Sequence, residues 1–464
     1  MAGELVAILG TLRKRSGPVN PPPGLNNHPL ASRGEGLFLP LVMPAPQTCS
    51  PIHRQPRLDG LTPVEVAARL AHLGGLVFFD TAGNLPSSAP VPVSVIAARP
   101  ERLLEGDFHD PADRQRLREE LAAHERIATD LGLPSGGLCG WIGYDGRFVF
   151  GVFPEMIVYA HDRGEWWETG ALSTELREPE TQPVAVGPFT PGMSHDAYLA
   201  AVQRAQDWIA AGDIYQVNLS QQFTASVAGG SLFPLYEHLR EASPAPMAAW
   251  LALGETEVLC SSPETFLRIF GQTIETRPIK GTRPRHADSE ADRRSAYELQ
   301  TSAKEIAELV MITDLLRNDL GQVCEFGSVQ VAEMLKLESL EQVHHLVSTV
   351  TGTLRPEVDA LEALAACHPG GSITGAPKKR AMEIIDALES RPRELYCGAI
   401  GWLGFEGEAC FNIAIRTLVR RGEALRYDVG GGIVADSDPE LEYQETLHKA
   451  AGIRLAIERW QGQG

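Results

Sequence analysis

The chain has 464 residues, of which 43% are hydrophobic, and a formal net charge of -19. This length supports one or two domains with large cores. The acidic charge argues against a general binder of nucleic acid or anionic membranes. Seven cysteines without a CxxC pair indicate a reducing compartment and no zinc ribbon or disulfide framework. Since no apolar run reaches the roughly 18 residues that span a membrane and no signal peptide is evident, we expect a cytoplasmic protein without nucleic-acid or membrane partners.

Residues 1–55 are rich in proline, glycine and asparagine, and we expect them to form an irregular tail. A first folded region is expected at 56–186, and its first helix is expected to start at Thr62-Pro63, a typical helix start. Apolar, β-branched segments then predict strands. The expected strands are 75–80, 91–98, 136–144 and 156–160, with an amphipathic helix at 111–132.

A larger region, 190–460, follows a polar linker. Its many antiparallel strands with a few interleaved helices favour an α+β fold over a doubly wound sheet. We expect helices at 195–211, 290–319, 357–367, 377–388 and 439–459, and strands at 214–223, 257–261, 265–270, 273–276, 342–353, 397–405, 409–419 and 424–434.

One lysine has an unusual sequence context. Lys280 lies between Pro278, which fixes its own backbone, and Gly281, which permits unusual angles and close approach of a ligand. Three arginines follow or precede it within five residues, and their positive charge would lower the proton affinity of the amine. The alternative is a solvated surface charge in a rigid turn.

Two expected helices each carry a pair of carboxylates. Glu305 and Glu308 are spaced i,i+3, as are Glu442 and Glu445, so each pair lies on one helix face. Carboxylates from two helices suit Mg²⁺, a hard cation that prefers oxygen ligands. Solvated helix faces with a lysine one turn away show the same spacing, so either helix alone is a weak signal.

Two glycine-rich segments are candidates for anion binding. The run from Cys367 to Lys378 combines three glycines, two hydroxyls and a helix that we expect to open with Pro377 at its first position, which suits a carboxylate. It is not a phosphate-binding P-loop, because Ala376 stands where a lysine is required. Gly430-Gly-Gly432, after a strand, offers open backbone N–H groups.

Two isolated charges complete the candidate site. Arg416 lies inside the apolar run 409–419, where a charge is usually paired or binds an anion. Glu264 follows Ser262-Pro263 at a strand junction and is a candidate general acid. An exposed turn residue is the alternative for Glu264.

These signals belong to a set of ordered motifs. The set comprises Asp213-Ile-Tyr-Gln-Val-Asn-Leu-Ser-Gln221, Ser262-Pro-Glu264, Pro278-Ile-Lys-Gly-Thr282, His344-His-Leu-Val-Ser348, His368-Pro-Gly-Gly-Ser-Ile-Thr-Gly-Ala-Pro-Lys378, Arg416 and Gly430-Gly-Gly-Ile-Val-Ala-Asp-Ser437. Together they closely resemble the chorismate-utilising enzyme family, over about 57–459 of this chain. The resemblance implies large antiparallel sheets packed as a sandwich with helices outside, the two regions being intertwined into one body.

The resemblance also implies a reaction. Glu264 would protonate the leaving 4-hydroxyl of chorismate, and Lys280 would attack C2 to form a covalent adduct. Ammonia would then add at C4 and give 4-amino-4-deoxychorismate for 4-aminobenzoate and folate synthesis. Members that make anthranilate or isochorismate usually carry alanine at the position of Lys280. Formation of anthranilate is the alternative.

Further site residues are carried over from the resemblance alone. Mg²⁺ would be held by Glu308 and Glu445, with Glu305 and Glu442 behind them. Gln216 stands where members that add water carry a lysine base, which disfavours that chemistry. The full set of expected substrate-binding residues is Gln216, Thr282, His345, Thr374, Tyr396, Arg416, Gly430, Gly432 and Lys449.

The resemblance finally implies partners. A glutaminase nucleophile elbow around Cys139 is interrupted by Trp141, so ammonia is expected from a separate glutamine amidotransferase subunit. Some family members bind tryptophan, and the segment Pro246, Met247, Ala248 matches part of that site. Asp80-Thr-Ala82 departs from the Ser-Gly type motif that is common in its other part.

Overall fold

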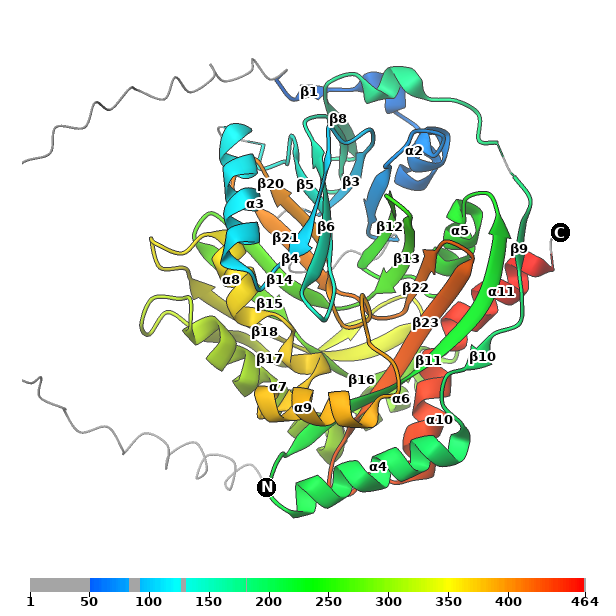
Figure 1. Ribbon diagram of the computed structural model, residues 1–464, viewed down its shortest axis with the longest axis vertical. Helices are drawn as coiled ribbons and strands as arrows, with labels where there is room; N and C mark the ends of the chain where they lie inside the picture. Colours follow the sequence, from blue (N-terminus) through cyan, green and yellow to red (C-terminus); the bar gives the residue numbers. More distant parts are fainter. Residues whose placement is uncertain (1–50, 83–91, 127–130, 181, 463–464) are drawn as a thin grey trace, which may run out of the picture. The chain divides into compact units, whose positions relative to one another are not determined.

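The computed structural model describes residues 51–82, 92–126, 131–180 and 182–462 (Figure 1). Residues 1–50, most of the segment expected to be an irregular tail, lie outside the described residues. The described residues form one compact unit. Its described residues form two antiparallel sheets and ten α-helices, and none of these helices is long and apolar enough to cross a membrane.

The first sheet has thirteen strands and draws on both ends of the chain. Its main path runs, in spatial order, through β1 (His53–Arg54), β8 (Glu165–Thr169), β7 (Met156–Ala160), β3 (Val93–Ala97), β2 (Val77–Asp80), β12 (Met247–Leu253), β13 (Thr256–Ser262), β22 (Thr417–Arg421), β23 (Ala424–Ile433), β11 (Gln216–Gly229) and β10 (Thr190–Pro191). Two short strands also pair with β11: β9 (Val184–Val186) and β19 (Gly375–Ala376).

The second sheet has ten strands. Its path is β16 (Ile279–Pro284), β18 (Val343–Thr353), β15 (Thr273–Arg277), β14 (Thr265–Phe270), β21 (Ala409–Ile413), β20 (Ala399–Gly404), β5 (Gly137–Ile142), β6 (Arg147–Phe153) and β4 (Leu103–Asp107), and β17 (Gln330–Ser339) also pairs with β18. Both sheets mix strands from 56–186 with strands from 190–460.

The two sheets pack face to face. One buried cluster joins side chains of β2, β3, β7, β12 and β13 from the first sheet to side chains of β5 and β20 from the second. Trp141 and Trp402 are the largest side chains that the second sheet contributes to this layer. The expected α+β sandwich of antiparallel sheets is therefore confirmed.

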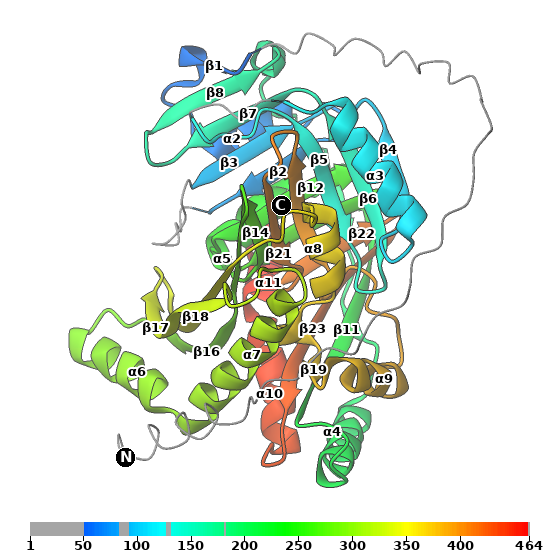
Figure 2. The same ribbon diagram turned by 90° about the vertical axis from the view of Figure 1, so that its left-hand side faces the viewer.

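Helices cover the outer faces of the sandwich (Figures 1 and 2). Hydrophobic side chains of α2 (Pro63–Leu70), α5 (Phe233–Ala242) and α11 (Ala451–Gln461) pack on the first sheet, and those of α4 (His195–Ala210) and α9 (Lys378–Leu388) pack near its β11 edge. The second sheet is covered by α3 (Pro111–Ala123), α6 (Ser289–Thr301), α7 (Ala303–Gly321) and α8 (Ala360–Cys367). The remaining helix, α10 (Pro439–Lys449), packs against β23 and α4.

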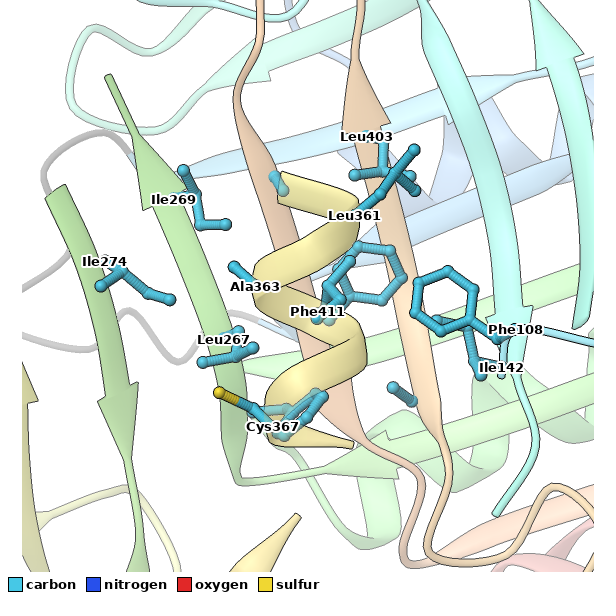
Figure 3. Close-up of a cluster of buried hydrophobic side chains, with 14 of the residues drawn as sticks. Phe108, Ile142, Leu267, Ile269, Ile274, Leu361, Ala363, Cys367, Leu403 and Phe411 are labelled. Carbon is cyan, nitrogen blue, oxygen red and sulfur yellow. The ribbon is translucent and has the colours of Figure 1, made fainter. Parts of the chain in front are cut away.

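Helix α8 shows how the second sheet is covered. Figure 3 shows Leu361, Ala363 and Cys367 on the inner face of this helix, above Leu267 of β14 and Phe411 of β21. Because these side chains are almost completely removed from water, they form the core on this side of the sheet. Asp359 caps the helix by accepting a hydrogen bond from the backbone N–H of Glu362. This packing fixes the loop that follows Cys367.

Three expected elements are divided in the structure. The helix expected at 290–319 is two helices, because Ser302 is extended (φ -68°, ψ 109°) and caps the second one. The helix expected at 439–459 breaks at Ala450. The strand expected at 409–419 is two strands in different sheets, so Arg416 does not lie inside a strand.

Smaller boundaries also differ from expectation. The helix expected at 111–132 ends at Ala123. Pro377 is the N-cap of α9 and not its first helical residue. Within the segment expected to be an irregular tail, His53 and Arg54 form β1 and pair with β8. These shifts leave the order of the main elements as expected.

Candidate active site

Glu264 lies where the chain passes from one sheet to the other. The strand β13 ends at Ser262, and β14 begins at Thr265 in the second sheet. Glu264 is only 5% exposed. Burial raises its pKa from 4.5 to about 7, against the opposing effects of a hydrogen bond from Ser372 and the charges of Lys280, Arg416 and Lys449. A carboxyl group in this state can hold a proton near neutral pH and deliver it, as a general acid must.

Lys280 is close to this acid. It belongs to β16, and its amine donates a hydrogen bond to the backbone carbonyl of Ser372 at 3.4 Å. The side chain of the same serine forms a hydrogen bond with Glu264 that lowers its pKa. The positive charge of Lys280 also acts on Glu308 and Glu445, the expected metal ligands. The amine therefore lies between the acid and the carboxylate helices.

A β-bulge at Gly281 sets the direction of Lys280. The pairing of β16 with β18 shifts between Lys280 and Thr282, and Gly281 has φ +75°. A Cβ at this position would come within 2.6 Å of the Leu299 side chain and 3.0 Å of Glu305 Oε2. Glycine is therefore required both for the backbone angle and for the close approach of α6 and α7.

The arginines near Lys280 do not surround it with unpaired positive charge, which corrects our expectation. Each guanidinium is engaged with a carboxylate: Arg277 with Glu338, Arg283 with Glu305 at 3.5 Å and Arg285 with Asp292 at 2.9 Å. The side chains of Glu264 and Glu308 also interact electrostatically with Lys280. The lysine is thus part of a mixed cluster of acids and bases.

The glycine loop after α8 is held by a buried ion pair that the sequence did not reveal. Arg393 binds Glu389 through two nitrogens and donates to the carbonyls of Ile373 (3.0 Å) and Asn218 (2.6 Å). Its guanidinium also lies over the ring of Tyr396, 5.7 Å from the ring centroid. One residue therefore ties the loop to β11 and to Tyr396, and the only available signal for it was an i,i+4 Glu-Arg pair.

Within this loop, Thr374 is fully buried. Its hydroxyl donates to the carbonyls of Gly370 (3.0 Å) and Gly371 (3.2 Å), so in this arrangement it stabilises the loop itself. The backbone carbonyl of Thr374 accepts a hydrogen bond from Asn218 at 2.8 Å. These bonds fix the position of Thr374 in the site.

Gly430-Gly-Gly432 of β23 meets three other parts of the site. A Cβ on Gly430 would lie 3.0 Å from the Tyr396 hydroxyl, and one on Gly432 would lie 2.0 Å from Gln216 Nε2. The middle glycine faces Glu442 and Glu445. Gln216 is 1% exposed, and its Oε1 has no hydrogen-bond partner among the described residues. Such an orphaned oxygen is available to a bound ligand.

Arg416 lies at the second crossing between the sheets, with φ +51°. Burial lowers its pKa, and the charge of Glu264 opposes this effect. Its guanidinium makes no hydrogen bond or ion pair within the described part of the chain, whereas its carbonyl accepts from the Ser261 N–H at 3.1 Å. A partly buried, unpaired guanidinium is suited to bind a carboxylate.

Thr282 and His345, both expected to bind substrate, contact each other across the strand pair. Thr282 Oγ1 lies 3.0 Å from His345 Nδ1, and His345 Nε2 is buried with no hydrogen-bond partner in the described part of the chain. Burial, together with the charge of Arg416, lowers the pKa of His345 to about 3. His345 is therefore a neutral imidazole with one free nitrogen.

The four expected metal ligands lie on α7 and α10, which face each other. Burial raises the pKa of Glu308, with Glu305 and Glu445 adding repulsion. Glu442 is 3% exposed, its Oε1 accepts from Ser437 at 2.7 Å, and its Oε2 has no partner among the described residues. Two ammonium groups occupy the carboxylates: Lys449 lies 2.7 Å from Glu445, and Lys304 lies 3.2 Å from Glu442.

This donor set fits a hard divalent cation. All four ligands are carboxylates, and lysine side chains already pair with two of them. One buried oxygen, Glu442 Oε2, has no partner among the residues that the structure describes. No three metal-ligating side chains of the described residues converge into a ready-made cage. The i,i+4 pair of Glu445 and Lys449 is also what a solvated helix face without a metal would show. Magnesium binding thus stays a prediction.

A cavity of about 90 Å³ lies apart from these groups, between the two sheets. Pro246, Met247 and Ala248 line it, together with Asp80 and Thr81. The Asp80 carboxylate accepts hydrogen bonds from Arg240 (2.7 Å) and Tyr236 (3.1 Å) of α5. The three residues singled out for tryptophan therefore lie together at a cavity, and occupancy by tryptophan stays a prediction.

Comparison with known proteins identifies the family. The sequence profile described as chorismate binding enzyme matches residues 110–454. The chain belongs to this family, and it is a chorismate-utilising enzyme of the anthranilate and aminodeoxychorismate synthase type.

The relatives carry both names. Anthranilate synthase component 1 of Thermus thermophilus is 46% identical over 409 residues, which cover 79% of this chain and 88% of that protein. Aminodeoxychorismate synthase component 1 of Klebsiella aerogenes is 41% identical over 350 residues, which cover 70% and 77%. The crystal structure of anthranilate synthase component I from Streptococcus pneumoniae superposes with a TM-score of 0.69 at 29% identity, covering 80% of this chain and 94% of that one.

The structure thus gathers most of the predicted residues at the crossings between the sheets. Glu264, Lys280, Arg416 and the carboxylates of α7 and α10 influence one another's charges. Cys139 is buried within β5, and burial raises the pKa of its thiol, so it is unsuited to act as a nucleophile. Sequence reasoning missed Arg393 and Lys304, whose partners are far away in the chain or on another helix.

Proposed function

We propose that this enzyme converts chorismate and ammonia to 4-amino-4-deoxychorismate. The observation that carries the proposal is the position of Lys280, whose amine shares Ser372 with the buried acid Glu264 and acts electrostatically on the carboxylates of α7 and α10. A lysine in this place is suited to attack a carbon whose leaving group is protonated by the neighbouring acid.

The first half of the reaction forms the adduct. The lone pair of the Lys280 amine attacks C2, both ring double bonds shift, and the bond between C4 and its hydroxyl oxygen breaks. Hydroxide is a poor leaving group, so Glu264 transfers its proton to that oxygen and water departs. The secondary ammonium formed on Lys280 then returns a proton to the Glu264 carboxylate.

The second half releases the lysine. Ammonia attacks C4, the double bonds shift back, and the bond between C2 and the Lys280 nitrogen breaks. Glu264 donates its proton to the departing nitrogen and receives one from the new ammonium at C4. The sum is chorismate and ammonia giving 4-amino-4-deoxychorismate and water, with both residues restored.

The two carboxylates of chorismate require separate partners. Arg416, whose guanidinium has no partner among the described residues, suits one carboxylate, supported by the backbone N–H groups around Gly430–Gly432. Mg²⁺ would be held by Glu308 and Glu445, with Glu305 and Glu442 behind them, and would supply positive charge to the ring carboxylate. Gln216, whose Oε1 has no partner among the described residues, would accept a hydrogen bond from the ligand.

Ammonia would come from a glutamine amidotransferase partner, and the product would serve 4-aminobenzoate and folate synthesis. Two features support a separate source. The Cys139 thiol is buried, and Trp141 interrupts the elbow that a glutaminase needs. Free ammonium should replace the partner at high concentration, since ammonia itself is the attacking molecule.

Product identification tests the proposal. The protein is incubated with chorismate, Mg²⁺ and ammonium, and the products are separated before and after addition of an aminodeoxychorismate lyase. We expect 4-aminobenzoate only with the lyase. Fluorescent anthranilate without the lyase would instead favour anthranilate synthesis, the alternative supported by the 46% identity to a protein of that name.

A further inference from the structure

Lys304 lies at a position that helix stability does not explain. It is the second residue of α7, and the first turn of a helix favours acidic side chains because the helix dipole is positive there. Its side chain is 44% exposed, so a simple surface role would leave it pointing into water. It instead reaches across to another helix.

The partner of Lys304 is an acid of α10. Lys304 Nζ lies 3.2 Å from Glu442 Oε1, whose side chain is only 3% exposed. That oxygen also accepts from Ser437 Oγ at 2.7 Å, while Oε2 of the same carboxylate has no partner among the described residues. The pair is therefore open to water only on the lysine side.

More than one acid acts on this ammonium group. Glu442 is its nearest partner, and the negative charges of Glu308 and Glu445 also stabilise it. A second ammonium, that of Lys449, lies on Glu445 at 2.7 Å. Three of the four carboxylates of α7 and α10 therefore face a cationic side chain, because Arg283 lies 3.5 Å from Glu305.

We propose that Lys304 is an internal competitor of the divalent cation. Its ammonium occupies Glu442 when the metal is absent and moves toward water when the metal arrives, so it limits the affinity of the site. The 44% exposure of its side chain leaves room for this movement. The inference rests on the proposed magnesium requirement and adds a residue that sets its strength.

The competition has a direct consequence for affinity. Removing the lysine charge leaves one further negative charge near the cation and frees Glu442 from a bond that must otherwise break. Because Lys304 is partly exposed, solvent screens much of its repulsion. We expect the cation affinity to rise about five- to tenfold on neutralisation, a modest electrostatic effect for a half-exposed charge.

The test measures metal binding without turnover. Mn²⁺ serves as the probe, since its free form gives an electron paramagnetic resonance signal that is lost on binding, and Mg²⁺ is measured by displacement. Four full-length proteins are compared: the unchanged chain, Lys304→Gln, Lys304→Arg and, as a matched control, Lys379→Gln. Lys379 is an exposed residue of α9, so its replacement removes one charge at a distance from Glu442.

The outcomes separate the two proposals. We expect Lys304→Gln to bind Mn²⁺ about five- to tenfold more tightly, with Lys304→Arg and the Lys379 control within about twofold of the unchanged protein. Saturable binding that is equal or weaker in Lys304→Gln would overturn the competitor role alone. Absence of saturable binding in all four proteins would overturn both this role and the proposed metal requirement.

Discussion

Replacing Glu264 with glutamine keeps the shape of a buried side chain and removes its ionisation. In the folded protein the pKa of Glu264 is raised from 4.5 to about 7 by burial. Below pH 4.5 the carboxyl is protonated in both the folded and the unfolded chain, and folding carries no ionisation cost. As the pH rises to 7, the Glu264 carboxyl ionises in the unfolded chain before it ionises in the folded chain, so the free energy of unfolding falls.

The magnitude follows from the size of the shift. A rise from 4.5 to about 7 corresponds to about 3 kcal/mol of unfolding free energy at pH 8. Glu264→Gln cannot ionise and escapes this loss. Relative to the unchanged protein, the variant should therefore gain about 3 kcal/mol between pH 4.5 and pH 8.

Urea denaturation of both proteins between pH 4.5 and pH 8.5 measures this difference. Glu255→Gln, at an exposed turn between β12 and β13, is the matched control and should show no such gain. The same Glu264 variant should lose about 10²- to 10⁴-fold in kcat with ammonium, because the leaving oxygen loses its proton donor. A stability difference that does not change with pH, or full activity of the variant, would refute the assignment of Glu264 as a buried acid.

Three further substitutions test the site. Gly432→Ala places a Cβ 2.0 Å from Gln216 Nε2 and should raise KM for chorismate about tenfold or more, whereas Gly74→Ala, which meets open space, should leave KM unchanged. Arg416→Met should raise KM for chorismate about 10- to 100-fold without lowering the urea midpoint, because its unpaired charge stabilises no described partner; a lower midpoint would indicate a structural role. Arg393→Met should destabilise the fold by about 3 to 5 kcal/mol in urea, because it leaves a buried carboxylate unpaired, and a loss under about 1 kcal/mol would contradict that reading.

Much of the fold was predictable from hydrophobic pattern and turn residues. The expected strand ranges leave short connections at Gly271, Gly407 and Gly422, and each of these glycines has positive φ. The edge strand β16 was not expected, because Pro278, Gly281 and Pro284 argue against a strand. Proline is tolerated on strands at the end of a sheet, which is where β16 lies.

The divided elements show where periodicity misleads. Apolar periodicity continues across Ser302, although its side chain caps a new helix by accepting from the Glu305 N–H at 3.4 Å. It also continues across Arg416, where the chain leaves one sheet and enters the other. Both breaks are set by tertiary packing, and a local window of sequence does not contain that information.

The candidate site was predictable in its residues but not in its electrostatics. Motif resemblance named Lys280 and Glu264, which the structure brings to the same serine. The flanking arginines suggested a positive environment for the lysine, whereas carboxylates at a distance in the chain pair with them. Sequence spacing identifies side chains that are neighbours on the same helix or strand, but it does not identify partners that lie on a different helix or strand.

The proposed reaction requires a covalent adduct on Lys280, and intact-protein mass spectrometry detects such an adduct. The unchanged protein and Lys280→Ala are incubated with chorismate and Mg²⁺ without ammonium, quenched in acid and weighed. We expect the unchanged protein to gain the mass of chorismate less one water, peptide mapping to place this mass on Lys280, and Lys280→Ala to gain nothing. An unchanged mass under these trapping conditions, together with undiminished product formation by Lys280→Ala when ammonium is supplied, would contradict the proposed reaction.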